Sequence, residues 1–227
     1  MGLRSRDLPT FRLTWGSPAF LVIILGYGMV ALISYTNSGL GPAYAERALG
    51  ISKSEIALFL GAPGALAGFL GVILGGRMGD FLLLRRADGR VLVVLFGLVT
   101  PAPMIYLAFT TESIFVFYIT SFLANMLSAS ALGAAAASSQ SLVLPRMRGV
   151  ATATVFLSTT LVGRGIGPFM AGYVSAVNGG DLGAGVVSTL VFVPIGVALL
   201  LAAIRLVPIA SANVIRRAKD AGEVLEG

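Results

Sequence analysis

Residues 63–80 read PGALAGFLGVILGGRMGD, and an uncharged stretch that overlaps them runs from Ile56 to Gly76. A helix needs roughly 20 mostly apolar residues to cross the hydrocarbon core of a bilayer, so this stretch is long enough to span a membrane. Because lipid offers the backbone no hydrogen-bond partner, we expect the segment to be helical. Glycines recur along it at steps of four, three and four residues: Gly64, Gly68, Gly71 and Gly75. Small residues on one helix face allow a second helix to pack closely.

The rest of the chain has the same apolar character. Of its 227 residues, 56% are apolar and 11% are charged, whereas about a quarter of the residues in a soluble domain are charged. The mean hydropathy is +0.92. We therefore predict an all-α integral membrane protein in contact with the lipid bilayer. Its six spans are expected at residues 18–39, 55–78, 91–110, 114–143, 150–176 and 185–207.

The six-helix bundle is expected to occupy residues 18–207, with a tail on each side. Residues 1–17 form the N-terminal tail, because the apolar run from Pro18 to Ile33 is too long for a typical signal-peptide core and lacks a clean cleavage site. Residues 208–227 form the C-terminal tail. From Ser211 onward we expect it to be solvated and partly disordered, with a short surface helix as the alternative.

The distribution of basic residues predicts the orientation of the bundle. Most of the 16 Lys and Arg residues lie in the two tails and in the second and fourth connections, whereas the other connections hold only Arg47 and Lys53. Cytoplasmic loops carry an excess of Lys and Arg, so both tails are predicted to be cytoplasmic. The expected location is a bacterial inner membrane. This topology explains the net charge of +6, so no nucleic-acid partner is expected.

Several kinds of chemistry are excluded by composition. The chain contains no cysteine and no histidine, which excludes disulfides, thiolate chemistry and ordinary zinc or haem ligation. We find no paired carboxylates and no nucleophile–base pair in the sequence. We therefore predict that the protein is not an enzyme and that it holds no metal and no cofactor.

Four stretches of the sequence resemble one transporter family. Residues 75–80, GGRMGD, followed by RRADGR at 85–90, resemble the cytoplasmic signature loop of the major facilitator superfamily. Residues 41–52, 144–151 and 163–172 are similar to segments in the C-terminal half of its Spinster-like branch. The resemblance implies the last six helices of a twelve-helix transporter, built from two inverted three-helix repeats.

The resemblance implies a function that this chain performs only in part. We expect transmembrane transport of a small amphipathic or anionic solute, as half of a secondary transporter that needs a second six-helix half. That half is another chain or a copy of this one. The alternative is a non-transporting truncated fragment or a membrane assembly partner. In Spinster-like proteins the proton-coupling acid and its arginine lie mainly in the N-terminal half, so this chain alone is not expected to perform proton-coupled transport.

The resemblance also implies a cytoplasmic gating loop. In the family, the loop aspartate is thought to latch onto the N-terminus of a helix, where unpaired N–H groups and the helix dipole attract a carboxylate. Asp80 would make this latch near Gly149, and the alternative is a solvated loop acid. Phe81 stands where the family usually has a basic residue. The gating-loop residues are Gly76, Asp80, Arg85, Arg86, Arg90, Arg146 and Arg148.

The first and fourth spans are implied to line a central cavity. Polar residues share a face on each, at helical spacing. Asn125 either contacts the solute or makes a hydrogen bond between helices. The cavity candidates on these two spans are Tyr27, Ser34, Tyr118, Ser121, Asn125 and Ser128.

Arg164 is the seventh cavity candidate and lies in the fifth span. It stands about 22 Å along that helix from Gly149, which places it inside the bilayer. A charge there is costly and needs a partner, yet the nearest acids all lie near the outer face. Its role is either anion binding or gating, or structural pairing. Helix packing in the second and fifth spans is assigned to Gly64, Gly68, Gly71, Gly75, Gly163, Gly167 and Pro168.

Overall fold

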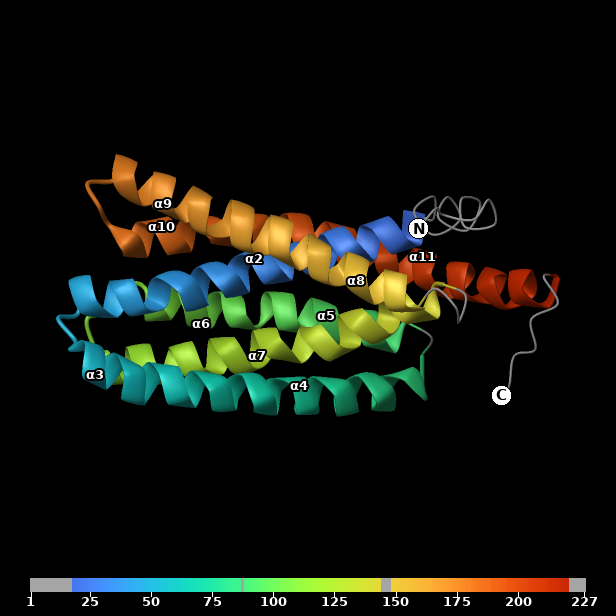
Figure 1. Cartoon of the computed structure of the whole chain (residues 1–227), viewed down its shortest axis with the longest axis horizontal. Helices are drawn as coiled ribbons and strands as arrows, with labels where there is room; N and C mark the ends of the chain where they lie inside the picture. Colours follow the sequence, from blue (N-terminus) through green and yellow to red (C-terminus); the bar gives the residue numbers. More distant parts are fainter. Residues whose placement is uncertain (1–17, 87, 144–147, 221–227) are drawn as a thin grey trace, which may run out of the picture.

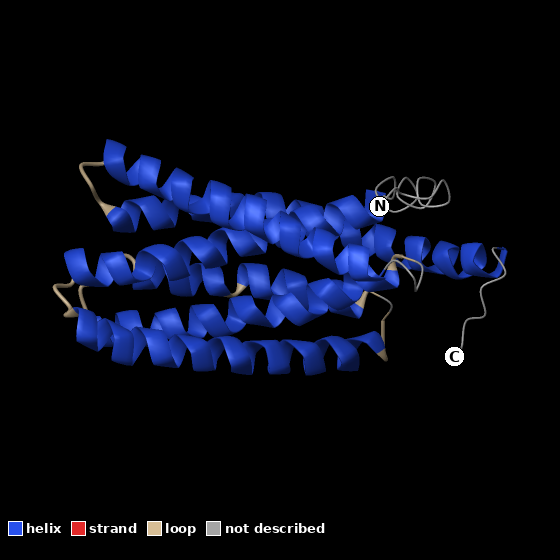
Figure 2. Cartoon of the chain, viewed as in Figure 1, coloured by secondary structure: helices blue, strands red, loops and turns tan. Residues whose placement is uncertain are grey.

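The structure is a computed structural model that describes residues 18–86, 88–143 and 148–220, with residues 211–220 described by their backbone alone. Over these residues the chain forms six apolar spans and no strand (Figures 1 and 2). The predicted all-α class and the six membrane-spanning helices are confirmed.

Several spans consist of more than one helical element. In chain order the spans are α2 (Pro18–Arg47); α3 (Lys53–Ile56), η1 (Ala57–Gly61) and α4 (Ala62–Leu83); α5 (Gly89–Val99) and α6 (Pro101–Ala108); α7 (Ile114–Ser141); α8 (Arg148–Ser158), η3 (Thr159–Ile166) and α9 (Gly167–Val177); and α10 (Leu182–Ser188), η4 (Thr189–Val191) and α11 (Phe192–Asp220). Elements η1 and η3 are π-helical, and η4 is a 3₁₀ turn.

The two ends of the bundle differ in their connections. Helix α2 begins and α11 ends at the same end, which we call the terminal end (Figure 1). The connections α2–α3, α6–α7 and α9–α10 lie at the other end, which we call the opposite end. Three helices begin at the opposite end, and a side chain caps the N-terminus of each. Ser52 and Glu55 form a capping box, Ser113 accepts from the Val116 N–H, and the Asp181 carboxylate accepts from the Ala184 N–H at 3.1 Å.

Prolines explain the breaks within the second, third and fifth spans. Pro63 and Pro168 each stand at the start of an α-helix that directly follows a π-helical segment. A proline has no N–H to donate to the carbonyl four residues earlier, and its ring crowds that carbonyl. The preceding turn therefore widens into a π-helix, and at Pro101 the third span separates into α5 and α6.

Glycines allow the closest helix contacts in the bundle. A methyl group added to Gly71 or Gly75 on α4 would collide with the carbonyls of Met126 and Ser130 on α7. Gly163 and Gly167 lie in the same way against α2. By contrast, a methyl group on Gly64 or Gly68 would meet no atom within 4 Å. The glycine repeat of the second span therefore packs inside the chain at its terminal half and faces open space at its opposite half.

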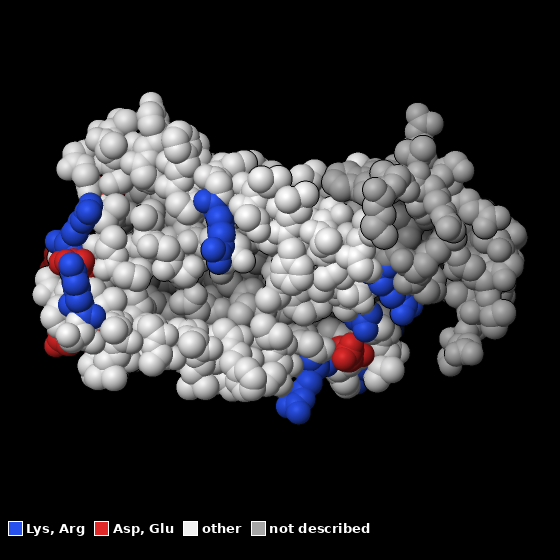
Figure 3. Space-filling model, in the orientation of Figure 1, with Lys and Arg blue, Asp and Glu red and all other residues white. Residues whose placement is uncertain are grey.

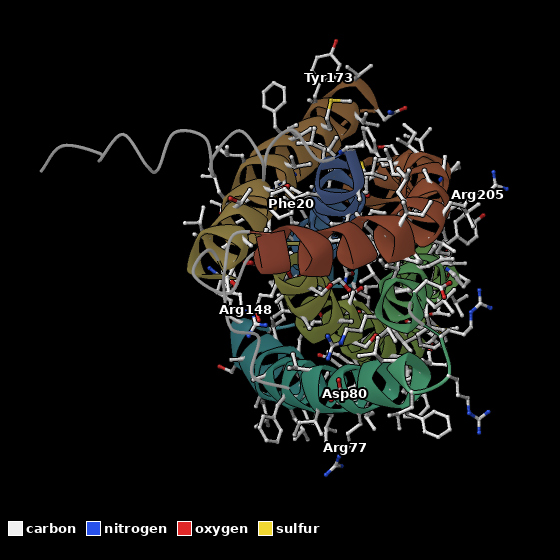
Figure 4. All side chains as sticks on the ribbon, turned by 90° about the vertical axis from the view of Figure 1, so that its right-hand side faces the viewer. Phe20, Arg77, Asp80, Arg148, Tyr173 and Arg205 are labelled. Atoms are coloured by element: carbon white, nitrogen blue, oxygen red, sulfur yellow. The ribbon has the colours of Figure 1, made fainter. Side chains whose placement is uncertain are left out.

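Burial is concentrated on the first span. Helix α2 is mostly buried, with Phe20 enclosed by neighbouring helices (Figure 4), whereas the second span is mostly exposed. Large apolar side chains such as Leu66, Phe69 and Leu74 of α4 are exposed. An apolar surface of this kind suits lipid or another membrane helix.

The C-terminal segment differs from its prediction. The sequence favours a solvated, partly disordered tail from Ser211 onward, with a short surface helix as the alternative. Helix α11 instead continues through Pro208 to Asp220 and extends beyond the other helices at the terminal end (Figure 1). Because Pro208 interrupts a helix without forcing it to end, composition alone did not reveal this continuation.

Candidate functional site

A cavity opens at the opposite end of the bundle, between the first, second and fourth spans. Its volume is about 460 Å³. Two of the predicted cavity residues, Ser121 and Asn125 on α7, line it. The remaining lining residues are Asn37, Ser38, Gly41, Pro42, Lys53, Ile56, Ala57, Leu60, Gly61 and Gly64.

Three polar residues of this cavity were missed by sequence reasoning. Asn37 and Ser38 lie within the predicted first span, but the polar face assigned to that span comprises Tyr27, Ala31 and Ser34. The helix runs to Arg47, and Asn37 and Ser38 lie on the cavity wall with Lys53 at its rim. The signal was available, because Ser34 and Ser38 are four residues apart and therefore share a helix face.

Among the described residues that line the cavity, Lys53 is the one with a charged side chain, and it forms an ion pair at the rim. Lys53 Nζ lies 3.5 Å from the Glu46 carboxylate. The Glu55 carboxylate accepts hydrogen bonds from the Ser52 hydroxyl and the Ser52 N–H, at 2.8 and 3.1 Å. The interior of the cavity is thus lined by amides, hydroxyls and small apolar groups, and its polarity comes from uncharged groups.

The other predicted cavity residues do not join this cavity. Tyr27 is 6% exposed and belongs to the hydrophobic core, and Ser128 is buried within the bundle. Ser34 is half-buried, and its carbonyl accepts from the Ser38 hydroxyl at 2.9 Å. Tyr118 lines a separate apolar groove with Phe59, and their ring centroids lie 5.7 Å apart.

The π-helical segment η1 separates the cavity from this apolar groove. Ala57 and Leu60 line the cavity, whereas Phe59 lines the groove together with Pro63 and the outer turns of α7. One short segment thus has a polar-lined space on one side and an apolar surface on the other.

Arg164 lies on η3 and is exposed at the surface of the chain. Its guanidinium carbon lies 4.7 Å from the centroid of the Tyr35 ring on α2, a cation–π contact. Among the described residues, none forms a salt bridge with it. Figure 3 shows charged side chains gathered near the two ends of this face, with one basic patch in its uncharged middle. Tyr35 is three residues from Ser38, so the arginine contact and the cavity wall share one stretch of α2.

The gating loop forms local ion pairs. Arg90 donates to the Asp80 carboxylate at 3.0 Å, and Arg86 donates to both oxygens of Asp88. The Arg85 guanidinium carbon lies 4.6 Å from the Phe81 ring centroid. Asp80 thus pairs with Arg90 on its own side of the bundle, and among the described residues we find no contact of Asp80 with the N-terminus of α8, which the predicted latch requires.

The remaining members of the predicted gating loop lie apart from these pairs. Gly76 faces open space. Arg148 is exposed at the start of α8 (Figure 4). Arg146 lies outside the described residues.

Comparisons with known proteins agree with the sequence motifs. A profile described as the Major Facilitator Superfamily matches residues 23–223. An MFS-type efflux pump of Mycolicibacterium smegmatis is 30% identical over 167 residues, which cover 74% of this chain and 39% of the pump. The chain therefore spans about two fifths of the length of that relative.

Two solved structures have the same fold over about half of their length. Both are of a bacterial homologue of the human lysosomal transporter Spinster, in an inward-facing conformation. The unoccupied form has a TM-score of 0.68 and 23% identity, and covers 95% of this chain and 53% of the homologue. The occupied form has a TM-score of 0.62 and 24% identity, with coverages of 89% and 49%.

Proposed function

The chain belongs to the major facilitator superfamily, and on that premise we propose that this multi-pass membrane protein transports a small amphipathic or anionic solute as one half of a secondary transporter. The observation that supports this proposal most directly is the polar surface on an otherwise apolar bundle. Asn37 and Asn125 line the cavity, and Arg164 contacts Tyr35 on the same helix α2. Lipid alone would not solvate these amide and guanidinium groups.

We propose that a second six-helix half covers this polar surface. The solved structures with this fold are about twice as long as the matched region. A guanidinium at the depth predicted for Arg164 requires protein, water or an anion nearby. The open glycines Gly68, Gly165 and Gly172 on the second and fifth spans face no atom within 4 Å, and they would allow helices of that half to approach closely. That half is another chain or a second copy of this one.

Reconstitution into liposomes tests this proposal. The chain would be inserted alone and together with a second six-helix half, and uptake of carboxyfluorescein (anionic) and of a fluorescent lysophospholipid (amphipathic) would be measured. We expect uptake of at least one probe only when both halves are present, because the chain alone supplies one wall of the pathway. Uptake by the chain alone would contradict the need for a second half. No uptake by the assembled pair would favour a non-transporting assembly partner.

A further inference from the structure

Asn37 is a buried amide whose hydrogen-bonding groups the protein leaves unused. It is 4% exposed and lines the cavity between α2, η1 and α7. No hydrogen bond joins its side chain to another described residue, yet its polar atoms are not among those sealed from solvent within the described part of the chain. The carboxamide is therefore free to bond to water or to a solute that occupies the cavity.

The neighbouring groups add both donors and acceptors to the cavity wall. Asn125 donates through Nδ2 to the Ser121 carbonyl at 3.0 Å, which leaves its Oδ1 as an acceptor toward the cavity. Ser38 donates to the Ser34 carbonyl and keeps its own oxygen as an acceptor. The Asn37 amide and the Ser121 hydroxyl supply donors. A hydroxyl group matches such a wall, because it both donates and accepts.

The charge of the wall restricts the occupant further. Lys53 is the one charged side chain among the described residues that line the cavity; it lies at the rim and pairs with Glu46 at 3.5 Å. The wall of the cavity inside this rim is lined by uncharged groups. The volume of about 460 Å³ lies within the range of roughly 300–1,000 Å³ that ligand pockets occupy. On its other side, η1 borders the apolar groove of Phe59 and Tyr118.

We propose that the cavity of Asn37, Ser38, Ser121 and Asn125 binds an uncharged, hydroxylated head group of the transported amphipathic solute. This inference rests on the proposed transport function and names the chemistry that the solute presents at this site. Asn37 and Asn125 form hydrogen bonds with the hydroxyl groups of this head group. Arg164 lies outside the cavity lining and remains available to bind an anionic group.

The native chain contains no cysteine, so a single introduced thiol reports on the cavity without background. A Ser38→Cys variant of the full chain in nanodiscs of phosphatidylcholine and phosphatidylglycerol would be reacted with a water-soluble maleimide. The probes are octyl glucoside, which carries an uncharged hydroxylated head group, and octyltrimethylammonium, which has the same alkyl chain and no hydrogen-bond donor. Both are used below the concentration that disrupts the discs. We expect octyl glucoside to slow the reaction and octyltrimethylammonium to leave it unchanged.

Amide substitutions then locate the binding groups. In the Ser38→Cys background, Asn37→Leu keeps the volume but removes both the donor and the acceptor, so the octyl glucoside concentration needed for protection should rise about tenfold. Asn125→Leu, at a half-buried position, should act in the same direction. The matched control is Asn178→Leu, an exposed asparagine at the opposite end but outside the cavity, and it should leave protection unchanged.

Some outcomes would overturn this inference. Equal protection by both probes would mean that only the alkyl chain binds, and protection by neither would mean that the cavity holds water alone. Persistent protection in both Asn37→Leu and Asn125→Leu would overturn it as well. Because labelling measures occupancy, protection without liposome uptake would support this site and contradict the proposed transport. Uptake without protection would support transport and overturn this site.

Discussion

Arg164 shows how a single charge constrains the function of an apolar bundle. Its guanidinium contacts the Tyr35 ring, and a contact of this kind contributes about 0.5–1 kcal/mol at an exposed site. That is less than the cost of a charge near the bilayer centre, which is at least about 2.5 kcal/mol. The ring therefore orients the guanidinium but does not replace a counter-charge. Water, an anion or, in our proposal, an acid of the second half would balance it.

We expect Arg164→Ala to weaken anion transport without unfolding the chain. A hydrogen bond to a charged group contributes about 1.5–3 kcal/mol, so the KM for carboxyfluorescein in liposomes that contain both halves should rise roughly tenfold or more. Arg164→Lys keeps the charge but loses the planar stack, so it should have an intermediate effect. Arg205→Ala is the control, because Arg205 is exposed on α11 and points away from the bundle (Figure 4). An unchanged KM in a well-folded Arg164→Ala protein would show that the arginine has no functional role.

Asp80 and Asp88 belong to the same loop region but differ in how far their side chains are exposed to solvent. The side chain of Asp80 is 72% exposed and that of Asp88 is 9% exposed, although each pairs with an arginine at 3.0 Å. An exposed pair contributes about 0–1 kcal/mol, which suits a contact that is remade during a conformational change. Asp88 instead accepts two hydrogen bonds from Arg86, directly before the start of α5, and such a bidentate pair is geometrically specific. Sequence reasoning singled out Asp80 and gave Asp88 no role.

At the scale of the element, the second span divides its glycines between two surfaces. Gly71 and Gly75 lie against α7, while Gly64 and Gly68 face open space. The same repeat thus serves packing inside the chain and, in our proposal, packing against a second half. Spacing alone could not distinguish these uses, because all four glycines lie within one helical stripe.

The two glycine surfaces should respond differently to a methyl group. Gly75→Ala places a Cβ against the Ser130 carbonyl, so we expect it to lower the free energy of unfolding by about 1–3 kcal/mol, the usual cost of overpacking. Gly68→Ala meets no atom and should stabilise the isolated chain by about 0.5–1 kcal/mol, because alanine favours a helix more than glycine does. Thermal unfolding in detergent micelles measures both. Similar destabilisation by the two variants would contradict this division.

The same pair of variants also tests the outer surface. If helices of a second half pack on Gly68, then Gly68→Ala should weaken co-purification of the two halves while leaving the chain itself folded. Unchanged co-purification would place the second half elsewhere.

At the scale of the whole molecule, the even number of spans brings both ends of the bundle's chain to one side. Helix α2 begins and α11 ends at the terminal end, where Arg85, Arg86, Arg90 and Arg148 also lie. We propose that this end is cytoplasmic and that the membrane is a bacterial inner membrane. Basic loops on one side favour this orientation.

Single cysteines at the two ends test the orientation. Ser54→Cys at the start of α3 and Ser141→Cys at the end of α7 are both exposed positions in a chain without native cysteine. In intact cells with a permeable outer membrane, a membrane-impermeant maleimide should label Ser54→Cys and should reach Ser141→Cys only after lysis. The reverse pattern would show that the termini lie outside the cytoplasm.

The sequence by itself determined that this protein lies in a lipid bilayer, and it determined the helical class, the number of spans and the family. The length of the apolar runs indicates the membrane and the number of spans. A backbone in lipid must satisfy its own hydrogen bonds, which indicates helices. Motifs such as the residues from Gly75 to Asp80 indicate the family. The sequence also identified Ser121 and Asn125 as candidate site residues, because helical spacing reports which side chains share a face.

Only the tertiary structure decided which of those faces meet. Tyr27 and Ser128 were selected by the same helical spacing as Asn125, yet they are buried among other helices. A polar helix face lines a cavity only where the neighbouring helix leaves space beside it. The cavity depends on the length of α2 beyond residue 39 and on the π-helical turn before Pro63. The π-helical turn has a local cause in Pro63, but the cavity forms only because α2, η1 and α7 meet in space. The pairing of Arg164 with Tyr35 and of Asp80 with Arg90 likewise arises from distances in space, which no residue spacing specifies.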